Sequence, residues 1–194
     1  MTKDQTETSG EEQFEIFTEG GEPVGTAPRS RVHAEGLWHK SAQVFLFDSQ
    51  GRLYLQRRVD SKDVCPGLWD QSAAEHLTPG ESYLDGALRG LAEELGLPRV
   101  HLTPLGEPFA GRLDQDALGV HDYELQQAFI GTWDGPMRID PEEVAEVRAV
   151  PTDELVSWIS RSPEDFTPWF LRDVVRCGIL PSTPTDPGGA PAEG

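Results

Sequence analysis

The sequence has few cysteines and few basic residues. Cys65 and Cys177 allow at most one disulfide, which excludes a domain built on a disulfide framework. Sixteen Lys and Arg residues stand against 34 Asp and Glu residues, so the net charge is −18. This balance lacks the positive footprint that duplex nucleic acid and anionic membrane surfaces require. An anionic substrate therefore needs a local basic patch or a bound cation.

Long apolar runs are also missing. No stretch approaches 18 apolar residues, and the first residues, MTKDQTETSGEEQ, contain no apolar segment, so we expect a cytoplasmic protein with neither a membrane span nor a secretion signal. The 194 residues suit one domain with tails. We expect an acidic tail at 1–12 and a Pro- and Gly-rich tail at 181–194 to be disordered, and 13–180 to form the domain. The pattern carries no signal for the oligomeric state.

Apolar runs bounded by turn residues predict a small set of strands and helices. The first two strands are expected to form a hairpin, and the strands at 43–47 and 52–58 are expected to pair across the turn at 48–51. The predicted strands are 14–17, 23–26, 43–47, 52–58, 123–133 and 146–150. The predicted helices are 82–95, 151–160 with Thr152 as N-cap, and 168–177. Strands mixed with few helices predict an α+β domain.

The helix at 82–95 has two distinct faces. Four leucines, at 84, 88, 91 and 95, form an apolar stripe, and Gly96 provides a C-terminal stop. Glu93 and Glu94 lie on one flank of that stripe, and Arg89 precedes Glu93 by four residues. Taken alone, this charge pattern is typical of a solvated helix face.

The spacing of the segment indicates more. Residues 75–97, EHLTPGESYLDGALRGLAEELGL, resemble the Nudix box, with matches at Glu81, Arg89, Leu91, Glu93, Glu94, Gly96 and Leu97. The resemblance implies a Nudix fold, a mixed sheet sandwiched between helices, in which Glu93 and Glu94 hold Mg²⁺ or Mn²⁺ against a diphosphate. Hard divalent ions prefer such carboxylate oxygens. Two positions depart from the box: Glu75 replaces its first Gly, and Gly90 replaces a Glu that is a metal ligand or a base in many members.

A wider resemblance covers residues 22–180, which are similar to the isopentenyl diphosphate isomerase branch of the Nudix superfamily. The matching segments include 22–26, 37–40, 55–58, 66–69, 80–82, 122–124 and 166–169. This resemblance implies one metal site of imidazoles and carboxylates, formed by His33, His39, His76, Asp122 and Glu124, where Asp122 replaces a Glu. It gives Glu94 a Mg²⁺-binding role and assigns diphosphate contacts to Arg29, to Arg57 or Arg58, and to Lys62. An imidazole-rich set suits a second ion, Zn²⁺ or Mn²⁺.

Three positions separate the chain from the isomerase. That enzyme has an acid–base Cys two residues before its third His, and this chain has Ala74 there, whose methyl group cannot carry a proton. Cys65 lies nine residues away in sequence, and a Tyr that the isomerase uses falls near Arg112. Glu93, where the isomerase usually lacks a carboxylate, restores the hydrolase pattern.

We therefore expect a metal-dependent hydrolase that cleaves a diphosphate linkage in a nucleotide-type or other small organic diphosphate. Gly90 cannot activate water, so the base is expected to be Glu75 or Glu124. Two alternatives stay open: an isopentenyl diphosphate isomerase with an altered acid–base residue, and a non-catalytic diphosphate-binding module. The aromatic residues that either contact the substrate's organic group or belong to the core are Trp38, Trp69, Phe109 and Trp169, with the core favoured. His101 and His121 are given no role.

Overall fold

The computed structural model describes residues 11–115 and 120–181. Its strands are β1 (Gln13–Phe17), β2 (Pro23–Pro28), β3 (Trp38–Phe47), β4 (Leu53–Arg58), β5 (Trp69–Asp70), β6 (Ala73–His76), β7 (Leu102–Pro104), β8 (Phe109–Gln115), β9 (Val120–Thr132) and β10 (Val144–Val150). Its helices are α1 (Arg29–Glu35), α2 (Tyr83–Leu95), α3 (Thr152–Arg161) and α4 (Pro168–Arg176), with a short 3₁₀ turn at Pro163–Asp165. No helix within these ranges is long and apolar enough to cross a membrane.

Strand β3 is the centre of a mixed sheet. On one edge it pairs in parallel with β9, from His39 opposite Glu124 to Phe47 opposite Thr132. On its other edge it meets β1, then β6, then β4. The predicted hairpin forms as β1 and β2.

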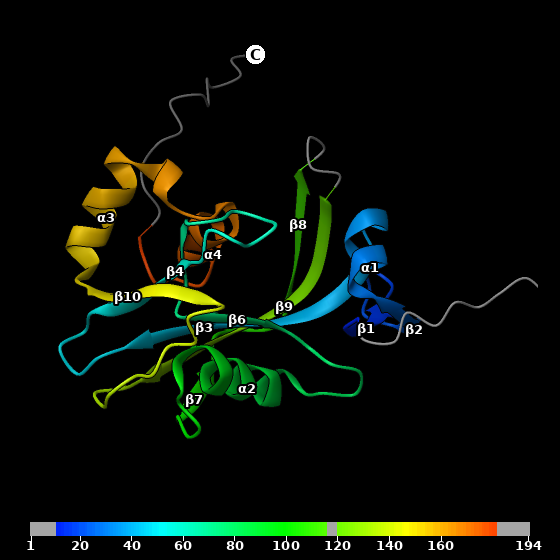
Figure 1. The fold of residues 1–194 in the computed structure, drawn as a ribbon, viewed down its shortest axis with the longest axis horizontal. Coiled ribbons are helices and arrows are strands. Elements are labelled where there is room, and N and C mark those ends of the chain that lie inside the picture. The colour runs from blue at the N-terminus through cyan, green and yellow to red at the C-terminus, as the bar shows by residue number, and fades with distance from the viewer. Residues whose placement is uncertain (1–10, 116–119, 182–194) are drawn as a thin grey trace, which may run out of the picture.

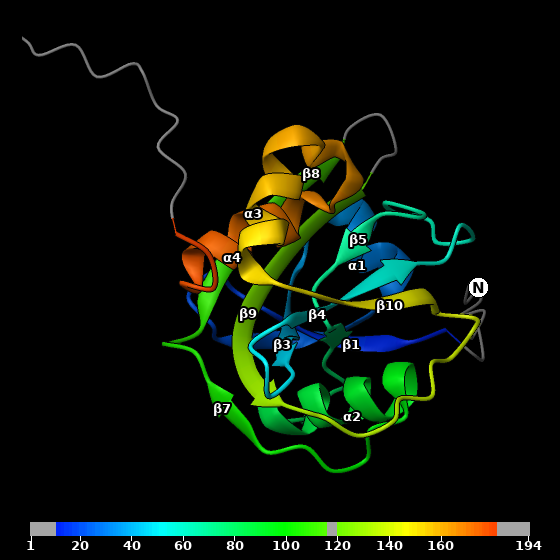
Figure 2. The same ribbon diagram turned by 90° about the vertical axis from the view of Figure 1, so that its left-hand side faces the viewer.

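The sheet lies between helices, with α2 on one face and α3 and α4 on the other (Figures 1 and 2). Strand alternation sends Ala42, Val44 and Leu46 into the core under α2, while Phe45 packs in the core under α3 and α4. This is the predicted α+β sandwich. Of the predicted tails, 1–10 and 182–194 lie outside the described residues.

Helix α2 begins and ends as predicted. The Ser82 side chain accepts a hydrogen bond from the Asp85 N–H, and Gly96 ends the helix with φ +69°. The buried face, however, is rotated from the predicted leucine stripe. Leu84 is 42% exposed, whereas Gly90 and Glu94 are buried. Small residues on this face bring the helix close to β6, and that approach carries Glu94 into the interior.

The local structure departs from the prediction in three respects. Strands β3 and β4 pair across the turn as predicted, but the pairing is limited to Phe47 and Leu53, because β6 occupies most of that edge of β3 and β10 pairs along β4. Pro151, not Thr152, is the N-cap of α3, and no side chain caps that end. Helix α1 was missed because it has no side-chain cap and buries only Val32.

Candidate active site and metal centre

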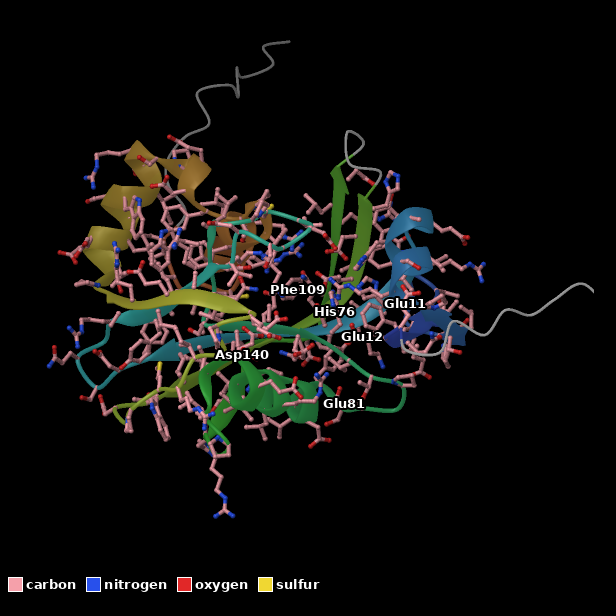
Figure 3. All side chains as sticks on the ribbon, viewed as in Figure 1. Glu11, Glu12, His76, Glu81, Phe109 and Asp140 are labelled. Carbon is pink, nitrogen blue, oxygen red and sulfur yellow. The ribbon has the colours of Figure 1, made fainter. Side chains whose placement is uncertain are left out.

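Three neighbouring strands bring the site together. On β3, residues two apart share a face, so His39, Ser41 and Gln43 point the same way. His39 lies opposite Glu124 of β9, and Ser41 lies opposite His76 of β6. Helix α1 then adds His33 from the end of the sheet. Figure 3 shows His76 on the α1 side of the molecule.

The predicted imidazole cluster is present as a compact group. His33, His39, His76 and Asp122 each offer one ligand atom, and these atoms lie within 4.8 Å of one another. The Oδ1 atom of Asp122 is 3.4 Å from Nε2 of His39 and 3.8 Å from Nε2 of His33. All three atoms are buried and have no hydrogen-bond partner among the described residues. Three unpartnered buried atoms that converge on one point fit a metal ion.

The protonation of two of the three imidazoles also suits a metal, whereas the hydrogen bond and charge of Glu124 outweigh burial and raise the pKa of His76. Burial lowers the pKa of His33 to about 3 and that of His39 to about 4, so both imidazoles are neutral near pH 7. Nδ1 of His39 is 3.0 Å from the Leu37 carbonyl, and a proton donated there leaves Nε2 with a free lone pair. Neutral imidazoles and a carboxylate are the donors that Zn²⁺ and Mn²⁺ accept.

Glu124, the fifth predicted ligand, is held beside the cluster. Its Oε1 is 3.3 Å from Nε2 of His76, and its Oε2 accepts a hydrogen bond from the Gln126 amide at 2.6 Å. Although burial alone raises the pKa of Glu124, the hydrogen bond and charge of His76 outweigh it and lower that pKa. Burial and the charge of Glu124 raise the pKa of Asp122. Glu124 is therefore the ionised partner of the pair.

The two box carboxylates occupy different environments. The Glu93 side chain is 58% exposed and lies 3.2 Å from Nη1 of Arg89. Glu94 is buried and accepts a hydrogen bond from the Gln56 amide at 2.6 Å. Burial and the charge of Glu75 raise the pKa of Glu94 to about 8. Oxygen donors of this kind fit a hard divalent cation, which would replace the proton that Glu94 holds at neutral pH.

Glu75, on β6, belongs to the same group of carboxylates as Glu93 and Glu94. Its Oε2 is 3.2 Å from Nη1 of Arg89, and burial raises its pKa against the opposing effect of Arg89. Arg89 itself is held by both carboxylate oxygens of Glu81 and by the His76 carbonyl. Arg89 therefore ties α2 to β6.

The predicted cationic residues divide between two environments. Arg29 is 3.1 Å from Nδ1 of His76, and Lys62 pairs with Glu143. Arg58 lies 3.5 Å from buried Asp70, whereas its neighbour Arg57 does not line the cavity described below. Successive residues of a strand point to opposite faces, so only one of these two arginines can face the cavity. The sequence alone did not show which one.

All the predicted site residues except His39 and Arg57 line one cavity of about 640 Å³. Its described lining contains ten carboxylate side chains and four Arg or Lys side chains. Only three lining residues, Val64, Ala74 and Trp169, have mainly apolar side chains. The cavity is therefore strongly polar and carries an excess of negative charge.

Buried glutamines in this cavity were missed by the sequence analysis. Within the part of the chain that the structure describes, fully buried Gln71 has no hydrogen-bond partner for either amide atom, and Oε1 of Gln43 has none either. The only signal was a glutamine opening the apolar run at 43–47. These atoms are available to a ligand.

The remaining candidates separate clearly. Trp38 and Trp69 are buried, and Phe109 packs against the core under α3 and α4, while Trp169 lines the cavity and donates its indole N–H to Asp70 at 2.9 Å. Ala74 lines the cavity and Cys65 does not. Arg112 lies over Trp38 and Tyr123, outside the lining. His121 pairs with Asp114, also outside it.

Comparison with known proteins identifies the scaffold. The NUDIX domain family matches residues 37–170. The chain is 32% identical over 170 residues to the isopentenyl-diphosphate Delta-isomerase of Burkholderia multivorans, covering 87% of this chain and 94% of that protein. It is 37% identical over 159 residues to the corresponding isomerase of Streptomyces griseus, covering 81% and 79%. The crystal structure of DR0079 from Deinococcus radiodurans superposes with a TM-score of 0.69 at 22% identity, covering 86% of this chain and 99% of that one. The fold is thus the predicted Nudix fold, and the chain belongs to the Nudix superfamily, in the branch of the isopentenyl-diphosphate isomerases.

Proposed function

We propose that this protein is a metal-dependent hydrolase of a polar organic diphosphate. The observation that carries the proposal is the lining of the cavity, in which ten carboxylates face four Arg or Lys side chains. A diphosphate anion is repelled by that excess unless divalent cations stand between it and the carboxylates. Metal dependence follows directly from the charge balance.

The same lining argues against a hydrocarbon substrate. Gln71 and Gln43 present buried amide atoms with no partner, and an alkenyl group would leave them unsatisfied. A nucleotide-type group carries donors and acceptors that would satisfy them. At position 74, a methyl group stands where proton transfer to an alkene would need an acid.

The predicted residues take distinct roles in this proposal. Glu93 and Glu94 would hold Mg²⁺ or Mn²⁺, and a cation bound there would polarise phosphoryl oxygens and lower the pKa of coordinated water. Arg29, Arg58 and Lys62 line the same cavity and would neutralise the phosphates. Attack of water on a phosphorus breaks its bond to the bridging oxygen. Glu124, ionised beside His76, is one candidate for the group that receives the water proton.

The imidazole cluster holds a second ion in this proposal. His33, His39, His76 and Asp122 supply a donor set for Zn²⁺ or Mn²⁺.

Isopentenyl diphosphate isomerisation is the second candidate. The imidazole cluster and the names of the relatives favour it. It requires an acid that replaces the missing group at Ala74. Diphosphate binding without turnover is the third candidate.

One experiment separates these functions. The protein is incubated with Mg²⁺ or Mn²⁺ and nucleoside diphosphates, dinucleoside polyphosphates, nucleotide sugars and isopentenyl diphosphate, and the mixture is followed by phosphorus and proton NMR. We expect new phosphate resonances that disappear in a Glu93→Gln, Glu94→Gln double variant and persist in Glu154→Gln, a control on the exposed face of α3. A migrated double bond with the diphosphate intact would establish the isomerase instead. Metal binding with neither change would indicate a binding module.

A further inference from the structure

The two departures from the Nudix box meet in space. Glu75 is on β6 and Gly90 is on α2, fifteen positions later in sequence. A Cβ atom placed on Gly90 would lie 3.0 Å from Cβ, 3.6 Å from Cγ and 3.7 Å from Oε2 of Glu75. The side chain of Glu75 therefore occupies the space into which a side chain at position 90 would extend.

Because of this crowding, we treat the two departures as one linked exchange: the carboxylate is at position 75 and the glycine at position 90, the reverse of the box pattern. Glycine inside a helix is less favourable than alanine because it loses more backbone freedom on folding, so the glycine at position 90 calls for a structural explanation. The contact supplies it, since a larger residue at 90 would force Glu75 to move. In the box pattern, with glycine at 75 and glutamate at 90, the same space would be filled from the helix.

The exchanged carboxylate still reaches the metal-binding wall of the cavity. Glu75, Glu93 and Glu94 all line it. Glu75 and Glu93 both lie 3.2 Å from Nη1 of Arg89, so one guanidinium holds the two carboxylates together. The charge of Glu75 acts on Glu94, and that of Glu93 acts on Glu75.

We propose that the third carboxylate of the divalent-cation site has moved from α2 to β6, so that Glu75 holds the cation together with Glu93 and Glu94. Gly90 is then the residue that makes room for it. This assignment rests on the proposed hydrolase function, because it completes the carboxylate set that the box otherwise lacks. It gives Glu75 the role of metal ligand and leaves proton transfer from water to another group.

The exchange can be reversed by mutation. Mg²⁺ affinity of the full chain is measured by titration calorimetry for the wild type, Glu75→Gln, Glu75→Gly and the Glu75→Gly, Gly90→Glu double variant. Mg²⁺ is chosen because imidazoles are poor ligands for it, so the histidine cluster does not contribute. We expect Glu75→Gln and Glu75→Gly to weaken binding at least about tenfold. The double variant should return to within about threefold of the wild type, since the two positions share one space.

Two controls keep the result interpretable. Glu154→Gln removes an exposed carboxylate of α3 outside the cavity and should leave Mg²⁺ affinity unchanged. Circular dichroism melting reports folding, and Gly90→Glu alone should melt below the double variant because two side chains then compete for one space. Wild-type affinity in Glu75→Gln, or a folded double variant no better than Glu75→Gly, would overturn the assignment.

Activity then distinguishes this assignment from the proposed function. Mg²⁺ affinity that follows the exchange, without hydrolysis of any diphosphate, would support the site and refute the hydrolase. Hydrolysis and Mg²⁺ binding that are both unaffected by Glu75→Gln would support the hydrolase and refute the site.

Discussion

Replacing Glu94 by glutamine should stabilise the protein when no divalent cation is present. Glu94 is 8% exposed, and its side chain accepts a hydrogen bond from the Gln56 amide at 2.6 Å. Burial, followed by the charge of Glu75, raises its pKa from the ordinary value of 4.5 to about 8. Glutamine keeps the shape and the acceptor oxygen but never has to bind a proton.

The magnitude follows from linkage between proton binding and folding. Because the pKa is raised in the folded state, the free energy of unfolding is unaffected by this group below pH 4.5. It decreases progressively as pH rises toward about 8. At pH 7 the folded state must hold a proton that the unfolded state has released, at about 1.4 kcal/mol for each pH unit above 4.5. The loss is about 3 kcal/mol, so Glu94→Gln should raise the melting temperature by roughly 6–12 °C in a chain of this size.

The assay is thermal unfolding in EDTA at several pH values, with Glu154→Gln as a control for removal of a carboxylate. The advantage of Glu94→Gln should vanish near pH 4.5 and be largest above pH 8. Adding Mg²⁺ should stabilise the wild type and not the variant, because the cation binds the ionised carboxylate of the folded state. A variant no more stable than the wild type at pH 7 in EDTA would refute the idea that Glu94, without a bound cation, is a buried acid that destabilises the folded state.

Three other substitutions test separate parts of the site. Gln71→Leu removes the unpartnered buried amide, so we expect unchanged or higher stability by urea denaturation and about tenfold lower kcat/KM for a nucleotide-type diphosphate; an unaffected kcat/KM would exclude contact with the substrate. His39→Gln should abolish stoichiometric Zn²⁺ or Mn²⁺ measured by elemental analysis while leaving Mg²⁺ affinity intact, and retention of the metal would place it elsewhere. Ala74→Cys places a thiol in the cavity, and we expect proton NMR to detect no double-bond migration in isopentenyl diphosphate, because the polar lining disfavours the alkenyl group; migration with metal bound would support the isomerase instead.

Periodicity and spacing predicted the parts of the fold that depend on local pattern. Helix α2 was predicted because its cap, apolar residues and terminal glycine are all written in one segment. Its buried face was not, because Glu94 is buried by the close approach of α2 to β6, which depends on tertiary packing. The pairing of β3 with β9 joins segments about 85 positions apart, and no local signal specifies it.

The candidate site divides in the same way. His33, His39 and His76 were grouped only through a family resemblance, since their sequence separations follow no metal-binding motif. Nothing in the sequence showed whether Arg57 or Arg58 faces the cavity. Successive strand residues point to opposite faces, and which face lines the cavity depends on the elements that cover each face. The buried amides of the cavity were missed for a related reason. The residue type alone does not show whether a glutamine in a strand is exposed to solvent or lines a cavity.

The charge of the cavity also constrains the order of binding. An uncomplexed diphosphate meets ten carboxylates and only four Arg or Lys side chains, several of which are already paired with carboxylates. Glu94 holds a proton at neutral pH until a cation arrives, so the cation and the proton compete for the same oxygens. A diphosphate that already carries Mg²⁺ brings the anion and the cation into the cavity together. The cation then offsets the repulsion between the phosphates and the carboxylates. We therefore expect the metal–diphosphate complex to be the species that binds, with an apparent KM that falls as Mg²⁺ rises and that falls further as pH rises toward 8.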